Sequence, residues 1–482
     1  MADNLLGIDV GTTSVKAGVI APDGAVLAQF SQGYQTHRQG ARVEQDPEDW
    51  VRLIEAALAQ FAGRSVAALG LCSQVDTHVF VGADGRALMP AIQWQDARAA
   101  PEAAELDAQV SDEQKIEWWG APMPIDATRA ISRMAWVARH MPDIWAQTRY
   151  VMLPKDYCLY RLTGQATTDP LSNIGLVGPD MAYVEPVFDL VPGSREKMAP
   201  LVSVTETAGT VSEGPFKGIP VASGTMDAWA GLIGAGGAGE GRTVYLSGTS
   251  EIIGISSQIV NPTPGAIVFP PCADVRLHAG PTNNGGDAQL WFSEVSGIAL
   301  SDISDMVTAC PRSQATPLFL PQLEGERAPL WNADLRGAFL NVSRKTKMAD
   351  FARAVQEGVA FSARHILETL QVSAGVQSDW IAGGGGGFVS DSWAQIRANV
   401  MGVPIRRLAS DQPGVLGAAM IAGMATGQFS NLTDAESLVT YSVEIEPQDD
   451  LVADYATVFE IYKEAITTQQ RLTERLQHVQ NG

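Results

Sequence analysis

Cysteine is scarce in this sequence of 482 residues, and the four cysteines lie far apart. No two of them form a CxxC pair, the spacing that many zinc and redox sites use. Their scattered positions also do not indicate a protein held together by disulfide bonds. We therefore expect buried free thiols in a reducing compartment at these positions, which are Cys72, Cys158, Cys272 and Cys310.

Basic residues are few compared with acidic ones, 33 against 54, and the formal net charge is −21. This balance disfavours nucleic acid and anionic membrane surfaces as partners. Met1–Asn4 leads directly into an apolar strand without a signal peptide, and no apolar run is long enough to span a bilayer. These absences predict a cytoplasmic protein that acts on small molecules, and a homodimer is the candidate assembly.

The chain has no GxxxxGK[ST] loop, but it opens on a different candidate for phosphate binding. In Leu5–Ile20 an apolar run ends at Asp9, a polar turn follows, and a second apolar run completes a predicted β-hairpin. Asp9 fits such a site if Mg²⁺ lies between its carboxylate and the phosphate. An ordinary hairpin with a polar turn is the alternative. The candidate donors to phosphate oxygens are Gly11, Thr12, Thr13, Ser14 and Lys16.

A second stretch repeats this pattern much later in the chain. Thr243–Ser257 again consists of an apolar run, a Gly-Thr-Ser turn and an apolar run. Aligning Gly248 with Gly11 places Leu246 opposite Asp9, so the hairpin is repeated and the carboxylate is not. We infer a duplicated architecture in which two domains face one nucleotide and only the first copy serves the metal. Chance similarity of two short hairpins is the alternative.

The length and the order of the predicted elements support two α/β domains. A chain of 482 residues is too long for one hydrophobic core. Apolar strands alternate with amphipathic helices, such as the one that Asp46 caps and Pro47 begins, and this alternation indicates an α/β layer fold. The glycine-rich stretch 231–241 is the predicted boundary, which divides the chain into domains 1–236 and 237–482.

Polar side chains follow the predicted buried strand Val66–Leu71. In α/β folds, ligands bind beyond the carboxyl ends of strands. Gln74, Asp76 and Thr77 are therefore candidates for hydrogen bonds to a polyol, and a polar loop without a ligand is the alternative.

An aromatic side chain beside an acid and a base forms a second candidate for a sugar site. Trp94 would serve as a packing wall, with Asp96 or Arg98 as its hydrogen-bonding rim. A purely structural Asp96–Arg98 pair is the alternative.

Asp227 is the candidate general base. It follows the glycine turn of Gly224-Thr225-Met226 and precedes a helix of small residues, where a carboxylate can face a cleft. Its task would be to take a proton from a hydroxyl that attacks phosphorus. A helix N-cap is the alternative, because Asp is a favoured capping residue.

Five consecutive glycines, 383–387, connect a predicted strand to a predicted helix. This composition suits a backbone that must approach something flat or crowded, such as an adenine and its ribose, and a flexible linker is the alternative. Gly414–Gly427 is predicted to be a helix of small residues, with the glycine run as its candidate neighbour.

Pro321–Pro329 is polar and rich in turn residues, which predicts a surface loop with internal pairs among Glu324, Glu326 and Arg327.

With these segments in view, the chain resembles the FGGY carbohydrate kinases over nearly its full length. GIDVGTTSVKAGV and YLSGTS resemble the two phosphate motifs of the family, and GTMDAWA places Asp227 at the catalytic base. Three departures stand out: Arg133 stands where Lys is usual, Asn341 where Gly is usual, and Gln356 at a usually apolar position. Further matches are Thr128–Pro142, Pro154–Gly164, the EGERAP segment, Gly337–Glu357, and GGGGGFVSDSWAQIRANVMGVPI, with Asn399 where Asp is common.

This resemblance implies two ribonuclease-H-like domains of the actin, hexokinase and Hsp70 ATPase type, with a catalytic cleft between them. It implies transfer of the γ-phosphoryl of ATP to a sugar or polyol hydroxyl. Asp227 would deprotonate that hydroxyl, and Asp9 would hold Mg²⁺. The resemblance assigns the phosphates to Thr12, Thr13, Gly248 and Thr249, and the nucleoside to Gly384, Gly385 and Asn399.

Within the family, the sequence most resembles the xylulokinase branch, in which a Gln-Met-His-Gly segment contacts the sugar. Here that slot reads Gln74-Val75-Asp76-Thr77. D-Xylulose is therefore the leading candidate, and another ketopentose or a linear alditol is the alternative. The Arg-Glu pattern of glycerol kinases is absent from the slot.

Two other classes of function are open to this fold. One is a sensor that binds sugar or nucleotide without turnover, because fold alone does not settle function. The other is an ATPase that needs no sugar, against which the GTMDAWA and EGERAP segments argue.

Overall fold

The computed structural model describes residues 3–480, which fold into two compact units, each containing a seven-stranded β-sheet. The two units exchange segments of the chain, so neither is one continuous stretch. The boundary predicted at residue 236 follows the chain order, whereas contacts return Gln412–Val439 to the first unit. The first unit takes the residues up to Gly234, Cys272–Asp274 and Gln412–Val439, and the second takes Ala235–Pro271, Val275–Asp411 and the residues from Thr440 onward.

The sheet of the first unit begins with the predicted hairpin. β1 (Leu5–Val10) pairs antiparallel with β2 (Ser14–Ile20) and parallel with β6 (Ala68–Ser73). The strand order is β10-β11-β6-β1-β2-β3, and β12 also pairs with β6. The carboxyl ends of β1, β6 and β12 therefore lie beside one another. The other strands of the unit are β3 (Val26–Gly33), β4 (His37–Gln39), β5 (Arg42–Gln45), β7 (Val79–Val81), β8 (Ala91–Ile92), β9 (Tyr150–Met152), β10 (Thr207–Thr210), β11 (Pro220–Ala222) and β12 (Thr225–Met226).

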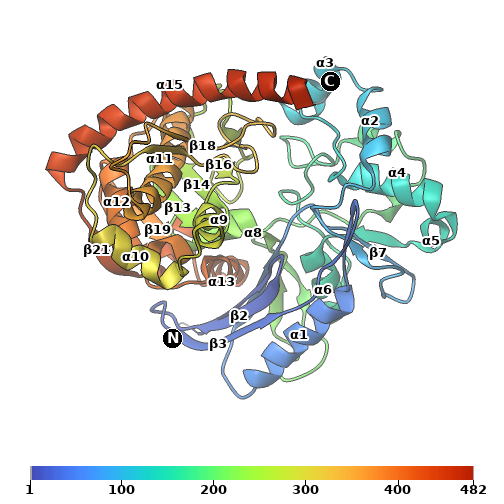
Figure 1. The fold of residues 1–482 in the computed structure, drawn as a ribbon. Coiled ribbons are helices and arrows are strands. Elements are labelled where there is room, and N and C mark those ends of the chain that lie inside the picture. Colours follow the sequence, from blue (N-terminus) through green and yellow to red (C-terminus); the bar gives the residue numbers. More distant parts are fainter. Residues whose placement is uncertain (1–2, 481–482) are drawn as a thin grey trace. The chain divides into compact units, whose positions relative to one another are not determined.

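Helices cover both faces of this sheet (Figure 1). α1 (Pro47–Gln60) begins at the predicted cap, since the Asp46 side chain accepts a hydrogen bond from Glu48 N at 3.0 Å. Its buried face joins Leu6 and Ile8 in one hydrophobic core. The other helices of the unit are α2 (Ala100–Asp107), α3 (Asp112–Trp119), α4 (Ala130–His140), α5 (Pro142–Gln147), α6 (Pro154–Thr163), α7 (Glu185–Phe188), α8 (Asp227–Gly234), α13 (Pro413–Ala425) and α14 (Leu432–Ala435).

The opposite face of β1 packs against α13, a helix of small residues. Successive side chains of a strand alternate between faces, so Gly7 faces away from the core of Leu6 and Ile8. A Cβ on Gly7 would lie 1.9 Å from Val415 O, and one on Gly417 would lie 1.9 Å from Ala230 O of α8. The close packing predicted for this helix is therefore present. Gly7 of β1 and Gly417 of α13 provide the space for this close approach.

The sheet of the second unit repeats the order of the first. β13 (Thr243–Ser247) and β14 (Glu251–Ser256) form the second predicted hairpin, β16 follows antiparallel, and β19 pairs parallel with β13. This is the relation that β1, β2, β3 and β6 have in the first unit, so the inferred duplication is confirmed. The other strands are β15 (Ile267–Val268), β16 (Leu277–Thr282), β17 (Leu318–Leu320), β18 (Ala338–Leu340), β19 (Ile381–Gly384), β20 (Ile405–Leu408) and β21 (Tyr441–Ile445).

The central helix of the second unit is α11 (Met348–Ala374), which packs against β14, β16 and β17 (Figure 1). Its buried residues join aromatic side chains of α15 in a separate core. The other helices are α9 (Gly286–Ser296), α10 (Leu300–Thr308), α12 (Asp391–Met401) and α15 (Asp449–Gln480).

The EGERAP segment corrects a prediction. Glu326 is only 3% exposed, so this part of Pro321–Pro329 is not a surface loop. Among the described residues, no ion pair joins Glu326 to Arg327; its carboxyl group accepts hydrogen bonds, and burial raises its pKa. The turn residues do not reveal this burial, because most of the polar groups that bond to Glu326 lie far along the chain: Thr282 Oγ1 (2.6 Å), Asn284 Nδ2 (2.6 Å) and Ser362 Oγ (3.0 Å). Gln322 Nε2 (3.1 Å) and Arg327 N (3.0 Å) of the same segment also donate to it.

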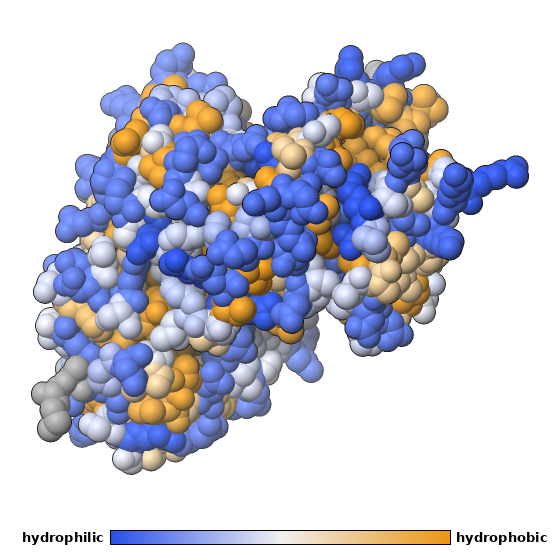
Figure 2. Space-filling model, turned by 90° about the vertical axis from the view of Figure 1, so that its left-hand side faces the viewer, coloured by the Kyte–Doolittle hydropathy of each residue, from blue (hydrophilic) through white to orange (hydrophobic). Residues whose placement is uncertain are grey.

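The surface carries hydrophilic side chains interspersed with small hydrophobic groups on the face shown in Figure 2. None of the helices between residues 3 and 480 is both long enough and apolar enough to cross a membrane. The cysteines are unpaired as predicted. Cys72, Cys158 and Cys272 are buried, and Cys310 is partly exposed.

Candidate active site

The turn between β1 and β2 is held from behind by two side chains that the sequence analysis did not single out. Tyr34 OH donates a hydrogen bond to Gly11 O, and Tyr34 N donates to Thr13 O at 3.3 Å. Gln45 Nε2 donates to Thr12 O at 2.9 Å. Three successive carbonyl groups of the turn are thus bonded within the first unit. No local sequence signal marked Tyr34 or Gln45, since each acts across the fold.

Asp9 lies near the end of β1, opposite Lys16 of the same hairpin and beside Cys72 of β6. Burial raises the pKa of Asp9 to about 6, although the charge of Lys16 acts in the opposite direction. Asp9 Oδ1 is buried and has no hydrogen-bond partner among residues 3–480. A Cβ on Gly414 would lie 2.7 Å from Asp9 Oδ2, so the first turn of α13 comes close to this carboxylate.

Asp227 follows β12 and is the first residue of α8. Because β12 runs parallel to β6, and β6 runs parallel to β1, Asp227 and Asp9 project from the same edge of one sheet. Burial raises the pKa of Asp227 to about 7, and the negative charge of Asp9 adds to this rise. Asp227 Oδ1 accepts a hydrogen bond from Ala228 N at 2.7 Å. The capping alternative and a catalytic role are therefore compatible, since this bond uses one of two carboxylate oxygens.

The segment after β6 is fixed by its own polar side chains. Gln74 is 1% exposed, and its Nε2 donates to Gln45 Oε1 at 2.7 Å. Thr77 is fully buried, donates to Gln74 Oε1 at 3.3 Å, and accepts from Trp94 N at 3.1 Å. The structure therefore places these polar groups in bonds within the protein. Val75, between them, is partly buried.

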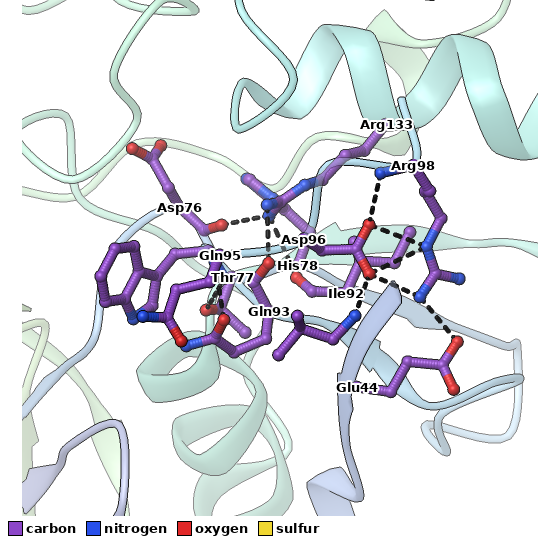
Figure 3. A network of polar contacts seen from close by, with 12 residues as sticks. Glu44, Asp76, Thr77, His78, Ile92, Gln93, Gln95, Asp96, Arg98 and Arg133 are labelled. Carbon is purple, nitrogen blue, oxygen red and sulfur yellow. Dashed lines mark hydrogen bonds and ion pairs between the residues drawn. The ribbon is translucent and has the colours of Figure 1, made fainter. Parts of the chain in front are cut away.

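Asp76 and Trp94 are the members of this group with partly exposed side chains. Trp94 is 37% exposed, and its Nε1 donates to Thr12 Oγ1 of the turn at 3.1 Å. The Asp76 carboxylate is 17% exposed and lies 3.4 Å from Arg129 Nη1. Burial raises the pKa of Asp76, although Arg129 and Arg133 act in the opposite direction. Figure 3 shows this carboxylate turned away from the network that holds its own backbone.

Asp96 and Arg98 form a structural pair (Figure 3). Arg98 Nη2 lies 2.7 Å from Asp96 Oδ2 and 2.7 Å from Glu44 Oε1. Asp96 Oδ2 also accepts from Val43 N at 2.6 Å. Both side chains are buried and bonded within the protein, which favours the structural pair over a hydrogen-bonding rim for sugar.

The turn of the second hairpin lies beside Gly285 and Gly286, two glycines that the sequence analysis missed. Gly248 N donates to Ser250 O at 2.9 Å. Gly286 N donates to Gly248 O at 2.8 Å, and Asp287 N donates to Thr249 O at 3.1 Å. The start of α9 therefore holds this turn. Two glycines between a strand and a helix were the available signal.

A buried ion pair supports the same hairpin. Arg397 of α12 and Glu251 of β14 are fully buried, and Arg397 Nη2 lies 2.7 Å from Glu251 Oε1. Arg397 Nη2 also donates to Ser247 Oγ at 3.0 Å, and Tyr245 OH donates to Glu251 Oε2 at 2.5 Å. Arg397 thus connects the second hairpin to the helix that follows the glycine run.

The glycine run meets crowded surroundings, as predicted. Gly385 has φ +90°, and a Cβ there would lie 2.3 Å from Ser247 O. A Cβ on Gly384 would lie 2.5 Å from Leu408 Cδ1. At Gly385 the positive φ and the backbone of β13 require glycine whether or not a nucleotide is present, whereas at Gly384 the close atom ends a leucine side chain.

Asn399 is 2% exposed, and its polar atoms are bonded within the second unit. Asn399 Oδ1 accepts from Gln448 N at 2.8 Å, and Nδ2 donates to Gln448 Oε1 at 3.0 Å. Asn399 therefore fastens the segment before α15 to α12.

Comparisons with known proteins agree with this arrangement. The profile of the FGGY family of carbohydrate kinases, N-terminal domain, matches residues 4–234, and that of the C-terminal domain matches residues 245–426. A xylulose kinase of Bacillus subtilis is 26% identical and aligns over 98% of both chains. Two solved structures from Lactobacillus acidophilus share the fold at 24% identity. They are a xylulose kinase (TM-score 0.87, 98% of this chain and 99% of that one) and a gluconate kinase (TM-score 0.86, 96% and 98%).

Proposed function

The chain belongs to the FGGY family of carbohydrate kinases, and from this premise we propose that it transfers the γ-phosphoryl group of ATP to D-xylulose or a related ketopentose. Family membership makes the chain a sugar kinase. The similarity to a xylulose kinase over nearly the whole length supports the choice of acceptor.

The observation that carries the proposal is the pair of buried carboxyl groups at one edge of the first sheet. Asp227 is the general base that takes the proton from the acceptor hydroxyl. Its pKa of about 7 suits this task, because a base works best when its pKa lies near the operating pH. The bond from Ala228 N orients the carboxylate.

Asp9 is the residue that would hold Mg²⁺. Its unpartnered buried oxygen and its repulsion with Asp227 both fit a divalent cation, which prefers carboxylate oxygen. When bound, the ion would supply positive charge against the charge of the phosphate oxygens.

The two hairpin turns and the glycine run are the proposed ATP contacts. In the first unit, Gly11–Ser14 and Lys16 bind phosphate. In the second unit, Gly248 and Thr249 bind phosphate, and the backbone of Gly384 and Gly385 faces the nucleoside. Asn399 supports the nucleoside-binding part of the second unit indirectly, through its hydrogen bonds to Gln448.

Asp76 makes a linear alditol the second candidate acceptor. It is the partly exposed acid of the segment Gln74–Thr77, which we assign to the sugar together with Trp94. A carboxylate accepts hydrogen bonds from any polyol hydroxyl, so it does not by itself require a ketose.

The test is release of ADP from MgATP in the presence of ketopentoses, ketohexoses, alditols, gluconate or glycerol. We expect turnover with D-xylulose and no comparable ADP release without sugar. Turnover with an alditol alone would favour the second candidate. Binding of sugar and ATP without any turnover would indicate a sensor. ADP release at the same rate with and without sugar would indicate an ATPase that needs no sugar.

A further inference from the structure

Arg133 joins the two segments that we assign to the sugar (Figure 3). It lies on α4, and its side chain is fully buried. Arg133 Nη1 donates to Asp76 O and, at 3.0 Å, to Ile92 O. Arg133 Nη2 donates to Gln93 O at 2.8 Å. One guanidinium therefore holds the segment after β6 and the segment that leads into Trp94.

The bond to Asp76 holds an unusual backbone conformation. Asp76 has φ 53°, in the left-handed region, which residues other than glycine rarely adopt. Because Arg133 binds the carbonyl group of this residue, it fixes the direction in which the side chain leaves the backbone. The carboxylate points away from Arg133 (Figure 3). Its Oδ2 lies 3.4 Å from Arg129 Nη1.

The protonation states of Arg133 and its neighbour His78 are consistent with Arg133 as a hydrogen-bond donor to the Asp76 backbone. His78 Nδ1 lies 2.8 Å from Arg133 Nη1. A hydrogen on Nδ1 would face the hydrogens of the guanidinium, so this nitrogen carries none and the ring is neutral. Burial lowers the pKa of His78, and the charges of Arg133 and Arg129 lower it further. Burial also lowers the pKa of Arg133 to about 10, which leaves the guanidinium charged at neutral pH.

Lysine could not replace this residue on equal terms. The bonds to Asp76 O and Gln93 O come from two nitrogens of one rigid plane, whereas lysine carries all of its donors on a single nitrogen. A lysine that donated a hydrogen bond to one carbonyl group would make a longer hydrogen bond to the other, or none.

We propose that Arg133 is a positioning residue for sugar specificity, which acts by fixing the Asp76 backbone and the approach to Trp94. The inference rests on the proposed function, since it takes Asp76 and Trp94 as sugar contacts. Arg133 itself touches neither the sugar nor ATP.

The experiment compares kcat/KM for the two best acceptors of the panel, whichever they are, in wild type and Arg133→Lys. We expect the ratio of the two values to change about tenfold, the size of one charge-assisted hydrogen bond, while KM for ATP stays within about twofold. A purely structural role would lower both kcat/KM values together. An unchanged ratio would overturn the inference and leave the sugar kinase proposal intact.

A double-mutant cycle tests whether Arg133 acts through Asp76. Asp76→Gly removes the carboxylate and tolerates the left-handed conformation. If Arg133 acts through Asp76, Arg133→Lys shifts the acceptor ratio in wild type and much less in the Asp76→Gly background. Equal shifts in both backgrounds would show that the path does not run through Asp76.

The control is Arg161→Lys, because Arg161 is another arginine of the same unit and pairs with Glu48. It should lower stability without changing the acceptor ratio. If no acceptor in the panel turns over, amide hydrogen exchange gives a separate reading. Faster exchange at 74–78 and 92–95 in Arg133→Lys, but not in Arg161→Lys, supports the inference, and unchanged exchange overturns it.

Discussion

Trp94 Nε1 donates a hydrogen bond to Thr12 Oγ1 at 3.1 Å. This bond joins an aromatic side chain of the proposed sugar site to the first phosphate turn. A second path runs from Thr12 O through Gln45 to Gln74, which precedes Asp76 by two residues. The sugar segment and the phosphate turn are therefore parts of one hydrogen-bonded group.

Trp94→Phe keeps the aromatic surface and removes the N–H donor. We expect kcat to fall about threefold to tenfold, the worth of one hydrogen bond, with a smaller change in KM for the sugar. Steady-state kinetics on the best acceptor provide the measurement. Trp118→Phe, on α3, is the control and should leave both constants unchanged. Unchanged kinetics in Trp94→Phe, with losses in Trp94→Ala alone, would show that packing alone matters.

Asp227→Ala should remove phosphoryl transfer and leave ATP binding nearly intact, because the carboxylate acts on the acceptor hydroxyl. We expect at least about a hundredfold loss in kcat. Asp227→Asn is the matched variant, since its amide oxygen can still accept from Ala228 N but cannot take a proton. If Asp227→Asn remained active, Asp227 would be a helix cap and nothing more.

Removing one partner of the Arg397–Glu251 pair should destabilise the protein, because the other charge would stay buried without compensation. Arg397→Met is expected to cost about 3–5 kcal/mol of unfolding free energy, and the double variant with Glu251→Gln should recover part of this loss. Urea unfolding provides the values. Glu444→Gln, which breaks an exposed pair with Arg406, is the control and should leave the midpoint unchanged. Additive losses in the double variant would mean that the pair is not coupled.

His278 should make stability depend on pH. It is fully buried; Nε2 lies 3.2 Å from Ser257 O and therefore carries the hydrogen, and Nδ1 accepts from Ser373 Oγ at 2.8 Å. Burial lowers the pKa of the folded His278 below the unfolded value of about 6.5. As pH falls through that unfolded value, the unfolded chain binds a proton that the folded chain does not, so stability decreases. The slope from this residue is at most about 1.4 kcal/mol per pH unit.

His278→Gln should therefore flatten the decline of unfolding free energy between about pH 7 and about pH 5. The midpoint of urea unfolding at several pH values measures the slope. His37→Gln, on the exposed strand β4, is the control and should keep the wild-type slope. A slope unchanged in His278→Gln would mean that this residue titrates in the folded protein as it does in the unfolded chain.

The features predicted from sequence are those that depend on short patterns. Both hairpins, the cap at Asp46 and the two-unit α/β fold follow from alternating strands, turn residues and capping chemistry, and the FGGY resemblance is confirmed by both family matches. Asp9 and Asp227 could be singled out because Asp9 interrupts an apolar strand near its end and Asp227 directly follows a short strand. Their catalytic roles stay predictions.

The missed features depend on partners that are distant along the chain. Gln45 and Tyr34 bind turn carbonyls, Arg397 pairs with a residue in another element, and Glu326 accepts hydrogen bonds from Thr282 and Ser362. No window of sequence contains both halves of such contacts. The packing of α13 on β1 was missed for the same reason, because the role of Gly7 becomes evident only when β1 and α13 are packed together.

The return of Gln412–Val439 to the first unit sets an order of events during biosynthesis. A ribosome releases β1, β6 and α8 early, but the helix that covers the glycines of that sheet emerges only after residue 411. Until then Gly7 and its neighbours present bare backbone to solvent or to chaperones. A fragment that ends near residue 236 would carry this uncovered face permanently. The N-terminal half is therefore a poor candidate for separate expression unless α13 is joined to it by a linker.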